Sequence, residues 1–76
     1  MAKTIHSKKH ERFCTLLVEA RKASGMTQQD VAAKLGKPQS YVSKYETGER
    51  RLDVIEFLEV AKVVGFSPDQ FLKACE

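Results

Sequence analysis

Residues that typically end or start a helix recur along the whole chain, and their spacing limits the possible folds more than any other feature. The glycines and prolines of the 76 residues are Gly25, Gly36, Pro38, Gly48, Gly65 and Pro68. Between them, apolar residues recur every three or four positions and β-branched alternation is absent, which favours short helices over strands. The sequence therefore predicts an all-α chain of five short helices.

The first two predicted helices meet at Gly25. The first begins between Thr4 and His10, and its inward face is formed by Phe13, Leu16, Leu17, Ala20 and Ser24. The second begins with Thr27 as the N-cap and Asp30 at the third position, and it ends at Gly36. Because a helix of about two turns is unstable alone, it must be held by packing.

The last two predicted helices repeat this pattern. Asp53 and Glu56 form a second capping box, and Ser67 with Pro68 starts the fifth helix. The expected core residues are Phe57, Val60, Ala61, Val64 and Phe71. No connection is long enough to separate two domains, so we expect residues 1–76 to form one domain, with residues 1–9 as a basic arm that is either flexible or helical.

The third predicted helix carries the face that bears on function. It is predicted to start at Pro38, whose ring suits a first helical turn, and to end at Gly48. At about 100° per residue, its polar side chains share a sector of about 140°, opposite Tyr41, Val42, Tyr45 and Glu46. That sector contains Gln39, Ser40, Ser43, Lys44 and Thr47. The major groove of DNA accepts such a face, because Gln pairs with adenine and Lys reaches guanine acceptors, although any exposed helix face is polar.

The turn Leu35-Gly36-Lys37-Pro38 between two short helices has the outline of a helix-turn-helix. The run MTQQDVAAKLGKPQSYVSKYETGERR resembles the Cro and phage-repressor helix-turn-helix family, also called the xenobiotic-response-element type. The similarity includes Ala32 where the two helices cross and Gly48 followed by basic residues, and it extends into Phe71-Leu72. It implies a compact five-helix lambda-repressor-like DNA-binding domain with the helix-turn-helix at the second and third helices.

The resemblance also implies roles for single residues. The positions that would read bases are Gln39, Ser40, Ser43 and Lys44. Gln28 would touch phosphate and brace Gln39. The further contacts to the DNA backbone would come from Lys37, Tyr41, Arg50 and Arg51. Tyr41 is equally open to a packing role. The alternative for Arg50 and Arg51 is that they are solvated charges after a turn, but two adjacent arginines beside the third helix favour backbone contact.

Two structural features follow from the same resemblance. Arg21 and Glu46 would form a largely buried ion pair between the first helix and the end of the third. Pro38 stands where the family usually has a capping Ser or Thr, so the cap of the third helix must come from the backbone or water. This departure leaves the approach angle of Gln39 open.

Charge is divided along the chain in a way that suits DNA. Residues 1–51 hold eleven Lys or Arg against five Asp or Glu, a net charge of +6, whereas the remainder has a net charge of −3. The first part attracts a polyanion and the second does not, which favours double-stranded DNA as a partner. Since related proteins bind two half-sites as two-fold dimers, we expect a homodimer through the C-terminal half. The expected contact residues are Ile55, Val63, Leu72 and Cys75.

Other classes of function find less support. No apolar run is long enough to span a bilayer, and no secretory signal begins the chain, so we expect a cytoplasmic protein that is prokaryotic or phage-encoded. Cys14 and Cys75 are interpreted as reduced thiols, with a disulfide as the minor alternative. His6, His10 and Cys14 recur every four residues, which leaves a metal-dependent sensor as a rival. No catalytic motif, cofactor or small-molecule ligand is expected.

The sequence thus favours a DNA-binding transcriptional regulator, a repressor or autoregulator that binds a two-fold operator as a homodimer. The other main hypothesis is a protein-binding adaptor on the same fold, such as an antitoxin or a transcription bridging factor. A controller of a restriction-modification system and a phage-type repressor are not separated by these observations.

Overall fold

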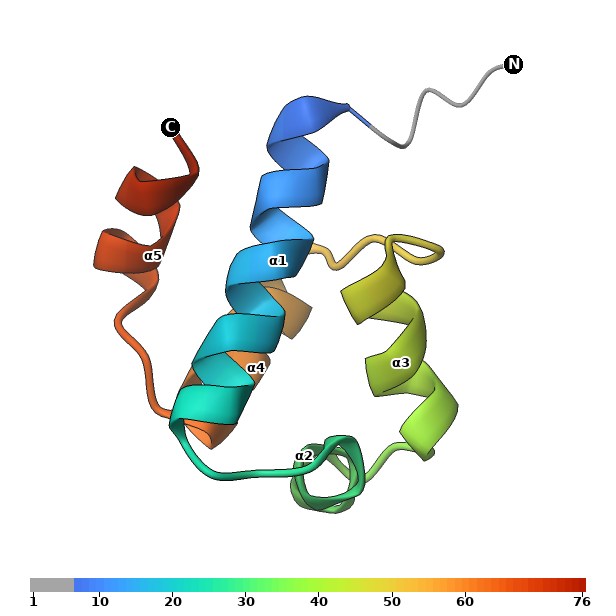
Figure 1. Ribbon diagram of the computed structural model, residues 1–76. Coiled ribbons are helices and arrows are strands. Elements are labelled where there is room, and N and C mark those ends of the chain that lie inside the picture. The colour runs from blue at the N-terminus through green and yellow to red at the C-terminus, as the bar shows by residue number, and fades with distance from the viewer. Residues whose placement is uncertain (1–6) are drawn as a thin grey trace.

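The structure is a computed structural model that describes residues 7–76. These residues form five helices: α1 (Lys8–Ala23), α2 (Gln28–Leu35), α3 (Gln39–Thr47), α4 (Val54–Val64) and α5 (Pro68–Cys75). No strand occurs within that range, so the predicted all-α class and five helices are confirmed. In Figure 1, α1 crosses in front of α4, with α5 on one side, α3 on the other, and α2 below. None of the described helices is long and apolar enough to cross a membrane.

The capping boxes predicted for α2 and α4 are both present. The Thr27 hydroxyl accepts a hydrogen bond from the Asp30 N–H at 3.0 Å, and Asp30 Oδ2 accepts one from the Thr27 N–H at 2.9 Å. Asp53 and Glu56 exchange the same pair of bonds at 2.7 and 3.0 Å. Each box satisfies N–H groups that a helix leaves unpaired at its start, which stabilises it by about 1 kcal/mol.

Helix α1 starts within the predicted range, directly after Ser7. The Ser7 hydroxyl accepts a hydrogen bond from the His10 N–H at 3.1 Å and so caps the helix. Lys8 and Lys9, at the end of the predicted basic arm, are helical and form the first turn of α1, because this cap supports helix from residue 8 onward. The remainder of the predicted arm up to position 6, including His6, lies outside the described residues.

The core lies between α1 and the four shorter helices. Its buried members are Leu17, Val31, Ala32, Val42, Tyr45, Phe57, Val60, Val64 and Phe71. Phe57 and Phe71 join Phe13 and Phe66 in a ring cluster with centroid distances between 4.6 and 5.8 Å. Val31 of α2 and Val42 of α3 are fully buried. The two helices of the helix-turn-helix are therefore fixed by the core on their inner sides.

Candidate functional site

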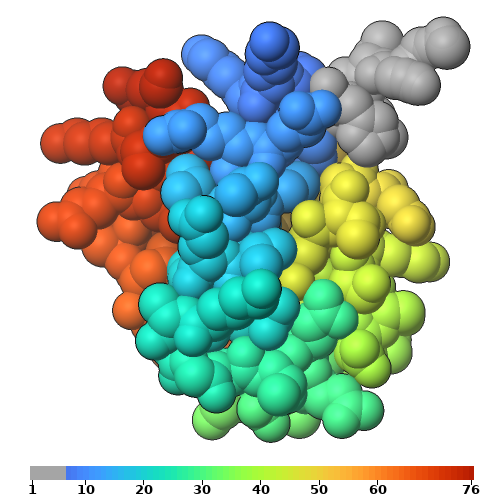
Figure 2. Space-filling model, viewed as in Figure 1, coloured from blue at the N-terminus to red at the C-terminus, as the bar shows by residue number. Residues whose placement is uncertain are grey.

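Helix α3 has one buried face and one exposed face. Val42 and Tyr45 are 0% and 2% exposed in the core. The four positions predicted to read bases lie on the other side, where Gln39, Ser40 and Lys44 are exposed and Ser43 is half-buried. Figure 2 shows α3 along one edge of the molecule, with its side chains projecting outward. This face is accessible to a large partner while the back of the helix is held.

The turn before α3 sets where its exposed face begins. Gly36 has a φ of 70°, a left-handed conformation that suits glycine, and the Lys37 N–H donates back to the Ala32 carbonyl at 3.0 Å. Helix α3 begins at Gln39, so the prediction that it starts at Pro38 was wrong by one residue. Pro38 is the N-cap, with φ −71° and ψ 157°. The proline ring fixes φ but not ψ, so it suits either position.

No side chain caps α3. The Tyr41 N–H donates to the Pro38 carbonyl at 3.0 Å, but an N-cap carbonyl accepts such a bond in any helix, so this bond does not replace the missing Ser or Thr cap. The first turn of α3 thus keeps N–H groups without a side-chain acceptor at the exposed edge that carries Gln39.

The structure brings Arg21 and Glu46 together. Arg21 Nε lies 2.7 Å from Glu46 Oε2, and Arg21 Nη2 lies 3.2 Å from Glu46 Oε1. The two side chains are only 13% and 4% exposed. Arg21 Nη1 also donates to the Met26 carbonyl at 3.0 Å, and the hydrogen bond to Glu46 raises the pKa of Arg21. The pair ties α1, the start of α2 and the last turn of α3 into one unit.

The side chains of Gln28 and Gln39 are hydrogen-bonded to each other, and Gln28 links them to the Arg21–Glu46 ion pair. Gln28 Nε2 donates to Glu46 Oε1 at 2.9 Å, and Gln39 Nε2 donates to Gln28 Oε1 at 3.1 Å. The side chain of Gln39, at the exposed start of α3, is thereby connected to the buried carboxylate at the other end of the helix.

A second ion pair lies on the other side of α3. Arg50 donates to Glu56 through Nη2 at 2.8 Å and Nη1 at 3.1 Å, and these bonds are the main reason that the pKa of Glu56 is lowered to about 2. The Arg50 guanidinium carbon lies 4.6 Å from the centre of the Tyr41 ring, and Lys37 Nζ lies 5.4 Å from it. Tyr41 packs edge-on against Tyr45 at 5.7 Å but remains half-buried. The predicted backbone contacts Lys37, Tyr41 and Arg50 thus form one cluster, and Arg51 beside them is exposed.

Sequence reasoning missed two links in these networks. Glu56 was identified only as a cap partner, although it also holds Arg50 six residues earlier. The bond from Gln28 to Glu46 was likewise not foreseen. In each pair the two residues lie on opposite sides of a turn, so helical periodicity does not predict the contact. The only signal in the sequence was the opposite charge of Arg50 and Glu56.

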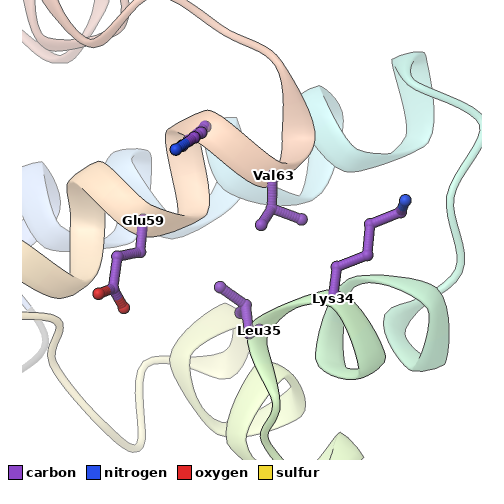
Figure 3. Close-up of a pocket in the computed structure, with 5 residues that line it drawn as sticks. Lys34, Leu35, Glu59 and Val63 are labelled. Carbon is purple, nitrogen blue, oxygen red and sulfur yellow. The ribbon is translucent and has the colours of Figure 1, made fainter.

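The residues predicted to form a dimer contact do not form one surface. Ile55 and Leu72 are 64% and 48% exposed, whereas Val63 and Cys75 are half-buried against the core. Val63 faces α2 and lines a hollow of about 530 Å³ (Figure 3). This hollow is lined by Lys34, Leu35, Glu59, Lys62 and Val63.

Leu72 lines a different hollow, of about 300 Å³, together with Val54 and Leu58. Val63 and Leu72, both predicted for the dimer contact, therefore line different hollows. Val54 and Val63 stand about 180° apart around α4 at 100° per residue, and α5 packs on the Val54 side. Val54 and Leu58 are themselves 71% and 44% exposed, and sequence reasoning missed both.

The thiols and the histidine of α1 contribute to packing. Both cysteines are free, and burial raises the pKa of each thiol. Cys14 Sγ lies 3.7 Å from His10 Nε2, and both residues are buried. Within residues 7–76, no group of three or more His, Cys, Asp or Glu side chains is placed to hold a metal ion. The third ligand of the metal hypothesis, His6, is outside that range.

Comparisons with known proteins agree with this geometry. A sequence profile described as helix-turn-helix matches residues 17–71. An XRE-family like protein from Pseudomonas syringae pv. tomato has a similar structure, with a TM-score of 0.86 and 49% identity over 95% of this chain and 88% of that one. The restriction-modification controller protein C.Esp1396I, solved as a tetramer with its natural 35 base-pair operator, has a TM-score of 0.81 over 92% of each chain. Its identity is 24%, so that likeness concerns the fold alone.

One curated relative is an uncharacterized HTH-type transcriptional regulator, y4dJ, from Sinorhizobium fredii, 40% identical over 47 residues. The match spans 62% of this chain and 61% of the relative, less than two thirds of that protein's length. The profile match, by contrast, covers most of this chain and includes α2, the turn and α3. The chain belongs to the XRE-type helix-turn-helix family.

Proposed function

We propose that the protein is a transcriptional regulator that binds double-stranded DNA in a sequence-specific manner, as a repressor or autoregulator. The observation that carries this proposal is the exposed polar face of α3, on a helix fixed from behind by Val42 and Tyr45. Gln39, Ser40, Ser43 and Lys44 then face the base edges of a major groove. Family membership and the regulator name given to the Sinorhizobium relative support the same conclusion.

Contacts to phosphate would come from the cluster on the flank of α3. Lys37 and Arg51 are exposed there, and Arg50 lies on the ring of Tyr41. These cations add affinity that falls with salt, and they carry no sequence information. Gln28, predicted to touch phosphate, would also brace Gln39, because its half-buried side chain is bonded to both Glu46 and Gln39.

The protein would act as a homodimer on a two-fold site. Large apolar side chains are exposed on α4 and α5, at Val54, Ile55, Leu58 and Leu72. An apolar surface of this kind, in the acidic half of the chain, suits a second copy better than it suits DNA. Of the contacts predicted from sequence, Ile55 and Leu72 remain in this proposal, while Val63 faces α2 and Cys75 is partly covered by the core.

Selection of bound sequences from a random pool of duplexes tests the function directly. Enrichment of a two-fold sequence, with half-sites about 34 Å apart along the duplex, would support a dimeric regulator. Binding that shows no preference and disappears with salt would instead favour the protein-binding adaptor. The control is a Gln39→Ala, Lys44→Ala double variant, which keeps the flanking cations and should enrich a less defined sequence.

A further inference from the structure

A chain of side-chain hydrogen bonds runs from the protein interior to the exposed start of α3. Arg21 holds the carboxylate of Glu46 at two points, Glu46 Oε1 accepts from Gln28, and Gln28 accepts from Gln39. Exposure increases along this chain, from the nearly buried Glu46 through the half-buried Gln28 to the exposed Gln39. Its inner end is therefore held in the interior, and its outer end lies on the exposed face of α3.

The chemistry of the carboxylate gives this chain a direction. A carboxylate paired with an arginine only accepts hydrogen bonds, so the group of Gln28 that faces Glu46 must be its NH₂. The carbonyl oxygen of Gln28 is then the group that faces Gln39. Gln39 must in turn direct its own NH₂ toward Gln28. Glu46 therefore determines the orientation of both amides, which does not depend on telling the similar N and O atoms of each amide apart.

This direction determines what Gln39 presents outward. One N–H of its NH₂ is used by Gln28, which leaves the second N–H and the carbonyl oxygen for another partner. A donor beside an acceptor matches the N7 and N6 groups of adenine in the major groove. The reverse orientation would direct both N–H groups outward, and two donors match the N7 and O6 acceptors of guanine.

We infer that Glu46 is a positioning residue for base choice: acting through Gln28, it orients the Gln39 amide so that the protein selects adenine over guanine at one base pair of each half-site. This inference rests on the proposed function. It adds a role for Glu46 beyond the ion pair with Arg21, because the ion pair alone would hold α3 without affecting which base Gln39 prefers.

The chain offers a matched set of variants. Gln28→Met keeps the length of the side chain but removes both hydrogen bonds, whereas Gln29→Met makes the same change at an exposed neighbour with no link to Glu46. Gln39→Ala identifies the base pair that Gln39 reads. Competition binding with duplexes that differ at single base pairs then gives the adenine-to-guanine preference at each position.

The wild type and Gln29→Met should prefer adenine by about tenfold or more at the base pair that Gln39→Ala identifies. Gln28→Met should lose most of that preference and keep the preferences at other positions. Retention of the full adenine preference in Gln28→Met would overturn the inference and leave the proposed function intact. A wild type that selects no sequence would overturn both, and a wild type that prefers guanine there would overturn the inference alone.

Glu46→Gln tests the inner end of the chain. Its amide has one acceptor for Arg21 and an NH₂ that can face Gln28, which would reverse the direction of the bonds. The adenine preference should vanish or change to guanine in the folded variant, as judged by circular dichroism; an unchanged preference would overturn the inference. If this variant does not fold, the comparison of Gln28→Met with Gln29→Met still tests whether the hydrogen-bond chain sets the adenine preference.

A measurement without DNA gives a second readout. The side-chain NH₂ signals of Gln39 in a ¹⁵N-correlated NMR spectrum should shift in Gln28→Met and stay in place in Gln29→Met. Equal spectra for the two variants would show that Gln28 does not hold Gln39 in solution, and would overturn the inference whatever the protein binds.

Discussion

Arg21 and Glu46 form a two-point ion pair that spans 25 residues of sequence and connects α1 to the last turn of α3. Both side chains are nearly buried. The pair therefore fixes the far end of the proposed recognition helix, while Val42 fixes its middle. Its loss leaves one charge in the interior without a partner, which is far more costly than the loss of a surface pair.

Arg21→Met should lower the free energy of unfolding by roughly 3–5 kcal/mol, because Glu46 stays buried and uncompensated. The control is Arg50→Met, which removes the partner of the more exposed Glu56 and should cost about 1 kcal/mol or less. Urea unfolding followed by circular dichroism measures both. Similar losses in the two variants would mean that burial of the Arg21–Glu46 pair has no energetic consequence.

Acid should weaken the Arg50–Glu56 pair over a defined range. The pKa of Glu56 lies at about 2 in the fold against an ordinary 4.5, so its contribution is complete above pH 4.5 and is lost as the pH falls toward 2. Glu56→Gln keeps the capping hydrogen bond but lacks the charge. The wild type should exceed this variant by about 0.5–1 kcal/mol near neutral pH, and the difference should shrink between pH 4.5 and 2. A difference that is constant over that range would contradict the assignment.

Lys44 and Arg51 should affect DNA binding in different ways. Lys44→Ala removes a cation from the exposed face of α3 and should relax the preference at one base step by about 1–3 kcal/mol. Arg51→Ala should weaken binding to all sequences alike and reduce the salt slope by about one. Competition binding with single-base variants at several salt concentrations separates the two effects, and the opposite pattern would reverse the assigned roles.

Ile55→Glu and Leu72→Glu should each give monomers in sedimentation, because a charge would be buried between two copies at the apolar surface of α4 and α5. Lys22→Glu changes the charge of an exposed residue on α1 and is the matched control. Dimers that persist in both apolar-surface variants would place the interface elsewhere.

The helices and their ends could be predicted because their causes are local. Thr27 with Asp30, and Asp53 with Glu56, form their capping boxes within four residues, so spacing alone identifies them. Pro38 shows the limit of such reasoning, since its φ suits both an N-cap and a first helical residue.

Features that depend on how the helices pack could not be read from the sequence. The position of Val63 against α2 and of Leu72 beside Val54 follows from which side of α4 receives α5. The bond between Gln28 and Glu46 depends in the same way on the angle between α2 and α3. Arg21 and Glu46 were paired only through a family resemblance, because nothing in their spacing predicts contact.

The ratio between the affinities for a selected operator and for a scrambled duplex tests most directly whether α3 reads sequence. It should be measured at salt concentrations from about 50 to 200 mM, over which phosphate contacts weaken strongly. If α3 reads sequence, both affinities should fall as the salt concentration rises, while their ratio stays at about 10³ or more. A ratio near one at every salt concentration would contradict sequence recognition by α3.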